Sequence, residues 1–379
     1  MVVGAAEADL VVGQRQVAQL VYRVGCVGDY FAQEDFFIGV NRVDHQVKQT
    51  LGFCLELFLS HSFDAPVHKA KAEKSYTLSG SPMELCGEKP DVISDLFVYD
   101  STLLLKGTVK ESPFMIHAYS LDDKSFKGSY IAKGRGENEL LSPHFEGLVQ
   151  EGIYIFDLNL CSSYCFDYVK SSETHNSELS HLVKLPGNTL YAYPMGDKHL
   201  ALVPGPEDFV GKIVDGNGAI LNTVSIYPHV SGIDFFSRLS SASLLGQSHK
   251  KFAMAMCRLP QVNFLDLETG DKFTIAISKE YKNWLNMLNG SDEDLRYYYL
   301  SCTQSSKYFM ALYFGGATRQ ERREGVLPHL HVFDWNGGFL YDIALNESIE
   351  SIAFDEMDNK LYGVDSNDDI YCYDTSRIL

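Results

Sequence analysis

The chain has 379 residues, of which 45% are hydrophobic and 22% charged, so it is long enough to bury a large apolar core. These ordinary proportions exclude collagen-like, low-complexity and disulfide-scaffold proteins. Thirty-two basic and 50 acidic residues give a formal net charge of −18, which repels phosphate backbones and anionic lipid surfaces, and we expect no nucleic-acid partner.

The first 65 or so residues differ in pattern from the rest of the chain. Glycines interrupt their short apolar patches, and no amphipathic period persists for long. We therefore expect residues 1–70 to form a poorly ordered or loosely attached extension. Residues 71–379 are expected to fold as one domain.

No export signal is recognisable at the start of the chain, and no membrane-spanning segment in this first part. A basic, apolar and small-residue order around Lys48–Ser62 gives the alternative hypothesis of an internal export signal. Glu7 and Asp9 stand where a signal peptide carries its basic residues. The most apolar segment, Leu51–Leu59, is only nine residues long and contains Glu56, whereas a membrane-spanning helix needs about 18 apolar residues. The sequence thus predicts no signal peptide at this N-terminus and no transmembrane segment.

A repeated strand-and-turn pattern organises the remainder. In each copy an alternating apolar strand ends in an aromatic or aliphatic residue, and Asp or a small polar residue and a tight turn follow. The six copies lie at Tyr119, Phe166, Val214, Leu265, Phe333 and Tyr373, with intervals of 47, 48, 51, 68 and 40 residues. Four strands of about five or six residues with their turns fill such an interval. The sequence therefore predicts an all-β fold, a six-bladed β-propeller.

Individual strands can be predicted in the later units because Gly, Pro, Asn or Asp separates them. The third unit is predicted to contain Thr189–Met195, His199–Val203, Val210–Val214 and Ile220–Ile226, and the fourth Ala242–Leu245, Phe252–Met256, Val262–Leu265 and Phe273–Ile277. The last unit has only three, Ile349–Phe354, Lys360–Val364 and Ile370–Tyr373. An open ring would leave an unpaired strand edge that invites aggregation. We expect an N-terminal strand, Ser75–Leu78, to close the propeller as the outer strand of the last blade.

Two segments interrupt the repeat. Ser278–Leu288 has the apolar spacing of a helix, with a capping Ser at its start and Asn-Gly after its end. It predicts a short helical insertion between blades 4 and 5 and accounts for the interval of 68 residues. Thr318–Gly325, TRQERREG, is expected to be a solvated loop between strands, with a partner-binding surface as the alternative.

The six Asp-turn hairpins, together with KGRGENELLSPHF at Lys133–Phe145, resemble the TolB-like six-bladed propeller proteins of bacterial cell envelopes. The resemblance extends from about Lys74 to the C-terminus. In that family the segment after the first blade often reads Gly-x-Gly-Pro-Gly-Glu; here Gly134, Gly136 and Glu139 match, while Glu137 and Asn138 replace Pro and Gly. Asn138 still tolerates a left-handed backbone, so the turn can persist.

The resemblance implies a fold more than an activity. It implies a binding or scaffolding role, and a periplasmic or cell-envelope location, although no lipobox cysteine follows an apolar run in this chain. A ligand of such a protein would be a protein, a peptide or a carbohydrate. The resemblance implies no cofactor.

Several motifs have a chemical and a structural interpretation. Gly134–Glu139 could be a phosphate loop, but no helix follows it, and a tight connection to the next blade is the simpler interpretation. Asp365–Asp369 lacks the Gly and Glu of a calcium loop and is interpreted as a hairpin turn. The eight cysteines lack CxxC spacing and are interpreted as packed core residues, and no GxSxG motif occurs.

His329 and His331 lie two apart in an extended segment and so project from one face, roughly 7 Å apart. They could share a metal ion with a third ligand. The sequence identifies no such ligand, so packed or solvated strand histidines are the favoured interpretation.

Ligands of propellers meet the loops around the central channel, near the starts of the innermost strands. The residues that precede or begin those predicted strands are Ser94, His144, Asn188, Arg238, Arg296 and Glu350. We expect them at a channel mouth of a non-enzymatic binding module. The alternative is a metal-dependent hydrolase of lactonase or esterase type, with Glu350, Asn188 and Asp95 as oxygen donors in the channel.

Overall fold

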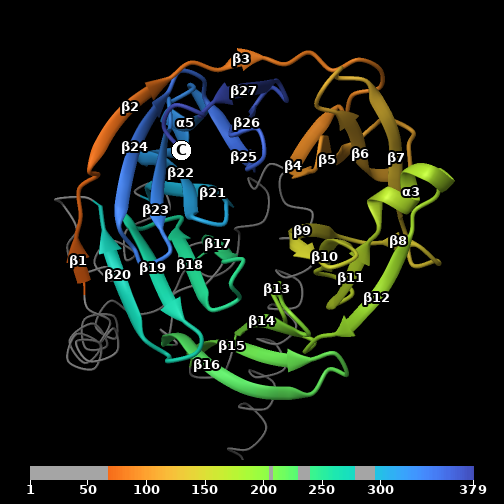
Figure 1. Cartoon of the computed structure of the whole chain (residues 1–379), viewed down its shortest axis with the longest axis horizontal. Coiled ribbons are helices and arrows are strands. Elements are labelled where there is room, and N and C mark those ends of the chain that lie inside the picture. The colour runs from red at the N-terminus through yellow and green to blue at the C-terminus, as the bar shows by residue number, and fades with distance from the viewer. Residues whose placement is uncertain (1–66, 205–207, 229–239, 278–294) are drawn as a thin grey trace, which may run out of the picture. The chain divides into compact units, whose positions relative to one another are not determined.

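The computed structural model describes residues 67–204, 208–228, 240–277 and 295–379. Its strands form six sheets that stand around a ring, and successive sheets follow the chain from yellow-brown through green to blue (Figure 1). In each sheet the first strand of the unit is innermost. The predicted all-β fold with six blades is therefore confirmed.

The first three blades follow one another without interruption. Blade 1 contains β4 (Val92–Tyr99), β5 (Thr102–Thr108), β6 (Phe114–Ser120), β7 (Phe126–Lys133) and the short β8 (Glu139–Leu140). Blade 2 contains β9 (Pro143–Val149), β10 (Gly152–Asp157), β11 (Ser162–Phe166) and β12 (Leu179–Lys184). Blade 3 contains β13 (Tyr191–Met195), β14 (Lys198–Pro204), β15 (Asp208–Asp215) and β16 (Ile220–Pro228).

Each of the last three blades takes an additional strand from residues before blade 1. Blade 4 contains β17 (Ser241–Leu245), β18 (Lys251–Met256), β19 (Gln261–Asp266), β20 (Lys272–Ala276) and β1 (Val67–Lys69); blade 5 contains β21 (Tyr297–Gln304), β22 (Tyr308–Ala317), β23 (His329–Asp334), β24 (Phe339–Leu345) and β2 (Lys74–Leu78); and blade 6 contains β25 (Ile349–Asp355), β26 (Lys360–Asp365), β27 (Ile370–Asp374) and β3 (Ser81–Pro82). The strands predicted for units three, four and six all occur, within about two residues of their predicted ends.

The ring is continuous because every blade packs against both neighbours. Along β5, Leu103 and Leu105 pack against residues of blade 6, whereas Leu104 between them packs against blade 2. Between blades 3 and 4, the rings of Tyr193 and Phe252 meet edge to face, with centroids 5.2 Å apart. A strand that is buried on both faces is expected to carry apolar residues on both faces, as β5 does. Contacts between β25 of blade 6 and β4 of blade 1 close the circle of innermost strands.

An outer strap, defined as residues 67–82, holds the end of the ring to its beginning. β1 runs parallel to β20, β2 runs parallel to β24, and β3 runs antiparallel to β27. Figure 1 shows these orange strands following the outer rim along blades 4, 5 and 6. Between β2 and β3, the Gly80 amide donates to the Asn346 side-chain oxygen at 2.7 Å. The strap thus covers strand edges on three blades.

The predicted pairing of Ser75–Leu78 with the last blade is wrong. That segment pairs with β24 of blade 5, in the register Ser75 to Asp342 and Leu78 to Leu345. The last blade instead receives Ser81 and Pro82, which pair with Cys372 and Tyr371. An N-terminal strand does complete blade 6, but the strand is the short one that follows the predicted segment. Residues 1–66, which contain most of the predicted extension, lie outside the described residues.

Two short helices lie within the described ranges. Helix α3 (Tyr168–Thr174) separates β11 from β12, and the Asp167 carboxylate caps it by accepting from the Lys170 amide at 2.9 Å. Helix α5 (Arg319–Arg323) begins at a capping box of Thr318 and Glu321. The segment predicted as a loop at Thr318–Gly325 is therefore partly helical. The predicted helix at Ser278–Leu288 lies outside the described residues, and no described helix is both long and apolar enough to cross a membrane.

The aspartates of the repeat explain why its turns recur. Asp215 accepts hydrogen bonds from the amides of Asn217 and Ala219, and Asp334 accepts from those of Asn336 and Gly338, at 2.7–2.9 Å. Each carboxylate satisfies backbone donors that the reversal would leave unpaired. The acidic turn at Asp365 uses the same device, which confirms the hairpin interpretation.

We predict that Gly80→Ala destabilises the ring through the strap. A Cβ atom at Gly80 would lie 2.7 Å from the buried Tyr373 ring, and overpacking of this kind costs about 1–3 kcal/mol. Chemical denaturation should show that loss of unfolding free energy. Gly187→Ala is the matched control because a Cβ atom there meets nothing within 4 Å. Equal stabilities of the two variants would contradict the close packing of the strap on Tyr373.

Candidate functional site

The first two strands of blade 1 and the innermost strand of blade 2 carry an acidic cluster, which we define as Asp95, Lys106, His144 and Glu146. Asp95 on β4 lies directly opposite Lys106 on β5. His144 and Glu146 come from β9 of the next blade. All four side chains are half-buried, so they lose hydration but remain within reach of a ligand.

Burial changes the charge of this cluster. It raises the pKa of Asp95 to about 6, although the nearby Lys106 ammonium acts in the opposite direction. Burial, and next the charge of Asp95, raise the pKa of Glu146 well above its usual range. Burial and the Lys106 charge lower the pKa of His144 to about 3. The cluster therefore holds two acids that ionise reluctantly and a histidine that stays neutral.

Asp95 and Glu146 also influence ionisable groups on other blades. The charges of Glu146 and Asp95 both contribute to the raised pKa of Cys302 on β21 of blade 5. The charge of Glu146 also contributes to the raised pKa of Tyr191 on β13 of blade 3. Cys302 of blade 5 thus lies within electrostatic range of both carboxyl groups, and Tyr191 of blade 3 within range of Glu146. We call the line around which the innermost strands stand the ring axis, and both carboxyl groups belong to innermost strands, β4 and β9.

Bulges in the innermost strands place the acids. Glu146 is the extra residue of a bulge in β9, because Phe145 and Gly147 pair with consecutive residues of β10. Ser94 is likewise the extra residue of a bulge in β4, beside Asp95. Such bulges interrupt the alternation of a strand and redirect a side chain.

The cluster has the chemistry of a cation-binding or hydrogen-bonding site. Two desolvated carboxyl groups are stabilised in their ionised forms by a positive charge between them. In their neutral forms they donate hydrogen bonds instead. Either form can therefore bind a polar group of complementary kind.

The residues predicted for the channel mouth have different partners among the described residues. Ser94 is exposed and donates to the Lys106 carbonyl at 3.3 Å, and His144 belongs to the acidic cluster. The Asn188 side chain donates to the Pro204 carbonyl at 3.0 Å. Arg296 forms an ion pair with Glu321 at 3.7 Å, and Glu350 accepts a hydrogen bond from Arg322 at 2.7 Å. Arg238 lies outside the described residues.

The three oxygen donors proposed for a hydrolase also have separate surroundings. Glu350 is engaged by Arg322 and Asn188 by a backbone carbonyl. Only Asp95 belongs to the acidic cluster. The arrangement of these three residues therefore gives no support to a shared metal ion between them.

The glycine-containing loop after β7 is built around its glutamate. Glu139 accepts a hydrogen bond from the Gly136 amide at 2.7 Å, and a Cβ atom at Gly134 would lie 1.9 Å from the same carboxylate. Asn138 has φ of +59°, which agrees with the left-handed conformation expected for it. Its side chain accepts from the Leu179 amide of blade 2 at 3.3 Å. The loop is thus a connection between blades, as the simpler interpretation predicted.

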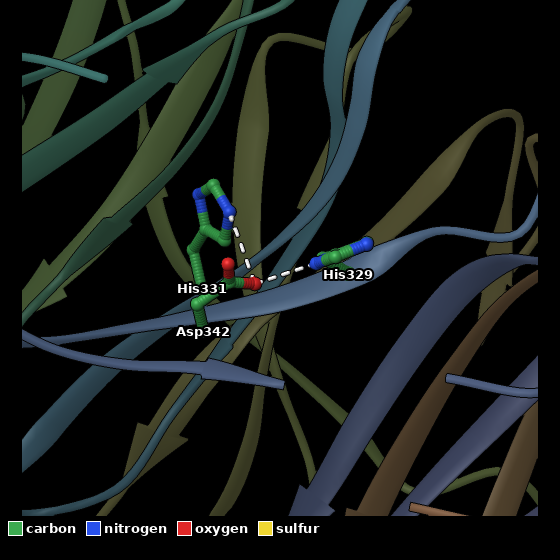
Figure 2. Close-up of side chains that lie close together, drawn as sticks. All are labelled: His329, His331 and Asp342. Carbon is green, nitrogen blue, oxygen red and sulfur yellow. Dashed lines mark hydrogen bonds and ion pairs between the residues drawn. The ribbon is translucent and has the colours of Figure 1, made fainter. Parts of the chain in front are cut away.

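A second polar cluster lies on blade 5 and contains His329, His331 and Asp342 (Figure 2). The Asp342 carboxylate lies 2.6 Å from Nδ1 of His329 and 3.7 Å from Nε2 of His331. The hydrogen bond to Asp342 raises the pKa of His329, whereas burial lowers the pKa of His331 to about 3. Asp342 is the third potential ligand that the sequence did not identify, since it belongs to the neighbouring strand.

Neutralising the two acids is predicted to stabilise the protein at neutral pH. Because the folded-state pKa values of both acids are raised, the folded protein binds more protons than the unfolded chain. Stability therefore falls as pH rises above about 4, and the contribution of Asp95 is lost through about 6. Asp95→Asn with Glu146→Gln should raise the unfolding free energy by about 1–2 kcal/mol at pH 7.5, after allowance for partial solvation, and by little at pH 4.5.

Denaturation at several pH values measures this difference. Glu84→Gln with Glu173→Gln is the matched control, because both residues are exposed and the same charge is removed. A gain that is the same at pH 4.5 and pH 7.5 would refute the assignment of the pH dependence to the two acids.

Comparisons with known proteins agree with this fold. A sequence search finds no matching curated protein. Among solved structures, a "Putative exported protein" from Bacteroides fragilis is similar to this chain, with a TM-score of 0.51 and 10% sequence identity. The similarity covers 81% of this chain and 98% of that one. At this identity it concerns the fold alone. The family model described as "TolB-like 6-blade propeller-like" matches residues 95–357, which is more than half of the chain. The chain therefore belongs to the TolB-like six-bladed propeller family.

Proposed function

We propose that the protein is a non-enzymatic binding module of the bacterial cell envelope, which takes a basic segment of a protein or peptide at the ring axis. The observation that carries this proposal is the pair of desolvated acids, Asp95 and Glu146, on the innermost strands of adjacent blades. An ammonium or guanidinium group beside them would stabilise both ionised carboxylates.

Two further properties support a basic ligand. The net charge of −18 accelerates the approach of a cationic partner and disfavours an anionic one. The cluster also contains only one cation, Lys106, for two carboxyl groups, so one negative charge is left to attract a ligand when both ionise.

The location in the cell envelope rests on similarity. The family model describes TolB-like propellers, and the similar structure from Bacteroides fragilis is of a protein described as exported. In such a propeller the loops around the axis are available to a partner protein. The partner would insert one basic side chain at the axis and contact the surrounding loops, as a scaffolding role requires.

Binding of a labelled cationic peptide tests the proposal. A fluorescein-labelled peptide with alternating Lys and Gly should bind the full chain, and its affinity should fall by at least about tenfold in Asp95→Asn with Glu146→Gln. Fluorescence anisotropy measures both affinities. The same peptide with acetylated lysines should not bind, because its positive charges are removed.

Glu84→Gln with Glu173→Gln separates specific from general attraction, because it lowers the net negative charge equally at exposed positions. Its affinity should stay within about twofold of the natural chain. An equal loss in both double variants, or no binding up to about 1 mM peptide, would overturn the proposal.

A further inference from the structure

The cluster of His329, His331 and Asp342 is created by the register of two strands rather than by a local motif. His329 and His331 stand two residues apart on β23, and Asp342 on β24 lies directly opposite His331. Figure 2 shows the carboxylate of Asp342 between the two imidazole rings. Within the described part of the chain, this is the one group of three or more His, Cys, Asp or Glu residues with potential ligand atoms within 4.8 Å of one another.

The His331 ring is held in position by its neighbours. Its Nδ1 atom lies 2.9 Å from the Tyr299 hydroxyl, and the Tyr313 ring stacks on it with centroids 4.2 Å apart. The tautomer protonated at Nδ1 donates to Tyr299 and leaves Nε2 with a lone pair toward Asp342. Metal-binding histidines are oriented in this way, by a hydrogen bond from their second nitrogen.

The separations suit a small divalent ion. Ligand atoms about 2.0–2.1 Å from a tetrahedral zinc ion are about 3.3 Å from each other. The distances from Asp342 to His329 and His331, 2.6 and 3.7 Å, lie on either side of this value. His331 is fixed, but the His329 side chain is 45% exposed and can move outward by the small amount required.

We propose that His329, His331 and Asp342 bind one Zn²⁺ ion, with at least one coordination position left to water or to a group of a ligand. Two imidazoles and one carboxylate are a donor set that zinc accepts, and three protein ligands with an open position distinguish a reactive or ligand-taking zinc site from a closed structural one. The exposed His329 and half-buried Asp342 give the ion a path from solvent. The site is separate from the acidic cluster and does not depend on the proposed function.

Titration of the metal-depleted full chain tests the site. Isothermal titration with Zn²⁺ should show one bound equivalent, and Co²⁺ should give the visible absorption bands of a four-coordinate ion. His331→Gln and Asp342→Asn should each weaken Zn²⁺ binding by more than about 100-fold, because they remove a ligand. Tyr299→Phe should weaken it by about tenfold, since it removes only the hydrogen bond that orients His331.

Two variants make the result decisive. His329→Gln changes a half-exposed side chain and should fold normally even if the buried His331→Gln variant does not, and it should also lose the bound equivalent. His181→Gln is the matched control, because it removes an exposed histidine on β12 of blade 2 and should bind zinc as the natural chain does. Zinc binding that persists in His329→Gln, or its absence in the natural chain at about 100 µM Zn²⁺, would overturn the proposal.

Discussion

Pairing between the outer strap and the last three blades is the interaction on which the closed ring depends. Each blade buries both faces against its neighbours, and blade 6 buries one of its faces against blade 1. β3 pairs with β27 and the Met83 amide donates to Ile370, which ties blade 6 to the segment that enters blade 1. The closed ring in turn brings Asp95 and Glu146 to a common axis with Cys302 of blade 5, and the acidic cluster is therefore a consequence of closure.

The blades could be predicted from the sequence because the patterns that specify their strands and turns lie within short segments. Alternating apolar residues and an Asp that caps the turn are both legible within about ten residues, as in Val210–Val214 followed by Asp215. The strap could not be assigned in the same way. Lys74–Leu78 has a strand pattern but no local feature that selects its parallel partner, and Ser81–Pro82 is too short to show a pattern, with a proline that only an edge strand accepts.

The site was predictable to the same extent. His144 is a candidate from the sequence because it lies near the start of an innermost strand, and Asp95 because it is a possible oxygen donor. Glu146 was missed: as the extra residue of a bulge it escapes the alternation that assigns strand faces. Asp342 was missed because its closeness to His331 comes from the pairing of β23 with β24, and a register is set by the whole hairpin rather than by either residue.

Crosslinking of the strap to the last blade tests the closure most directly. Ser81 lies opposite Cys372, and paired residues on antiparallel strands are close enough for a disulfide. Under oxidising conditions, Ser81→Cys should form a disulfide with Cys372, identified by mass spectrometry of the linked peptides. Ser75→Cys, which lies opposite Asp342 of blade 5, should leave Cys372 free. A Cys372 linkage in Ser75→Cys and none in Ser81→Cys would contradict the closure described above.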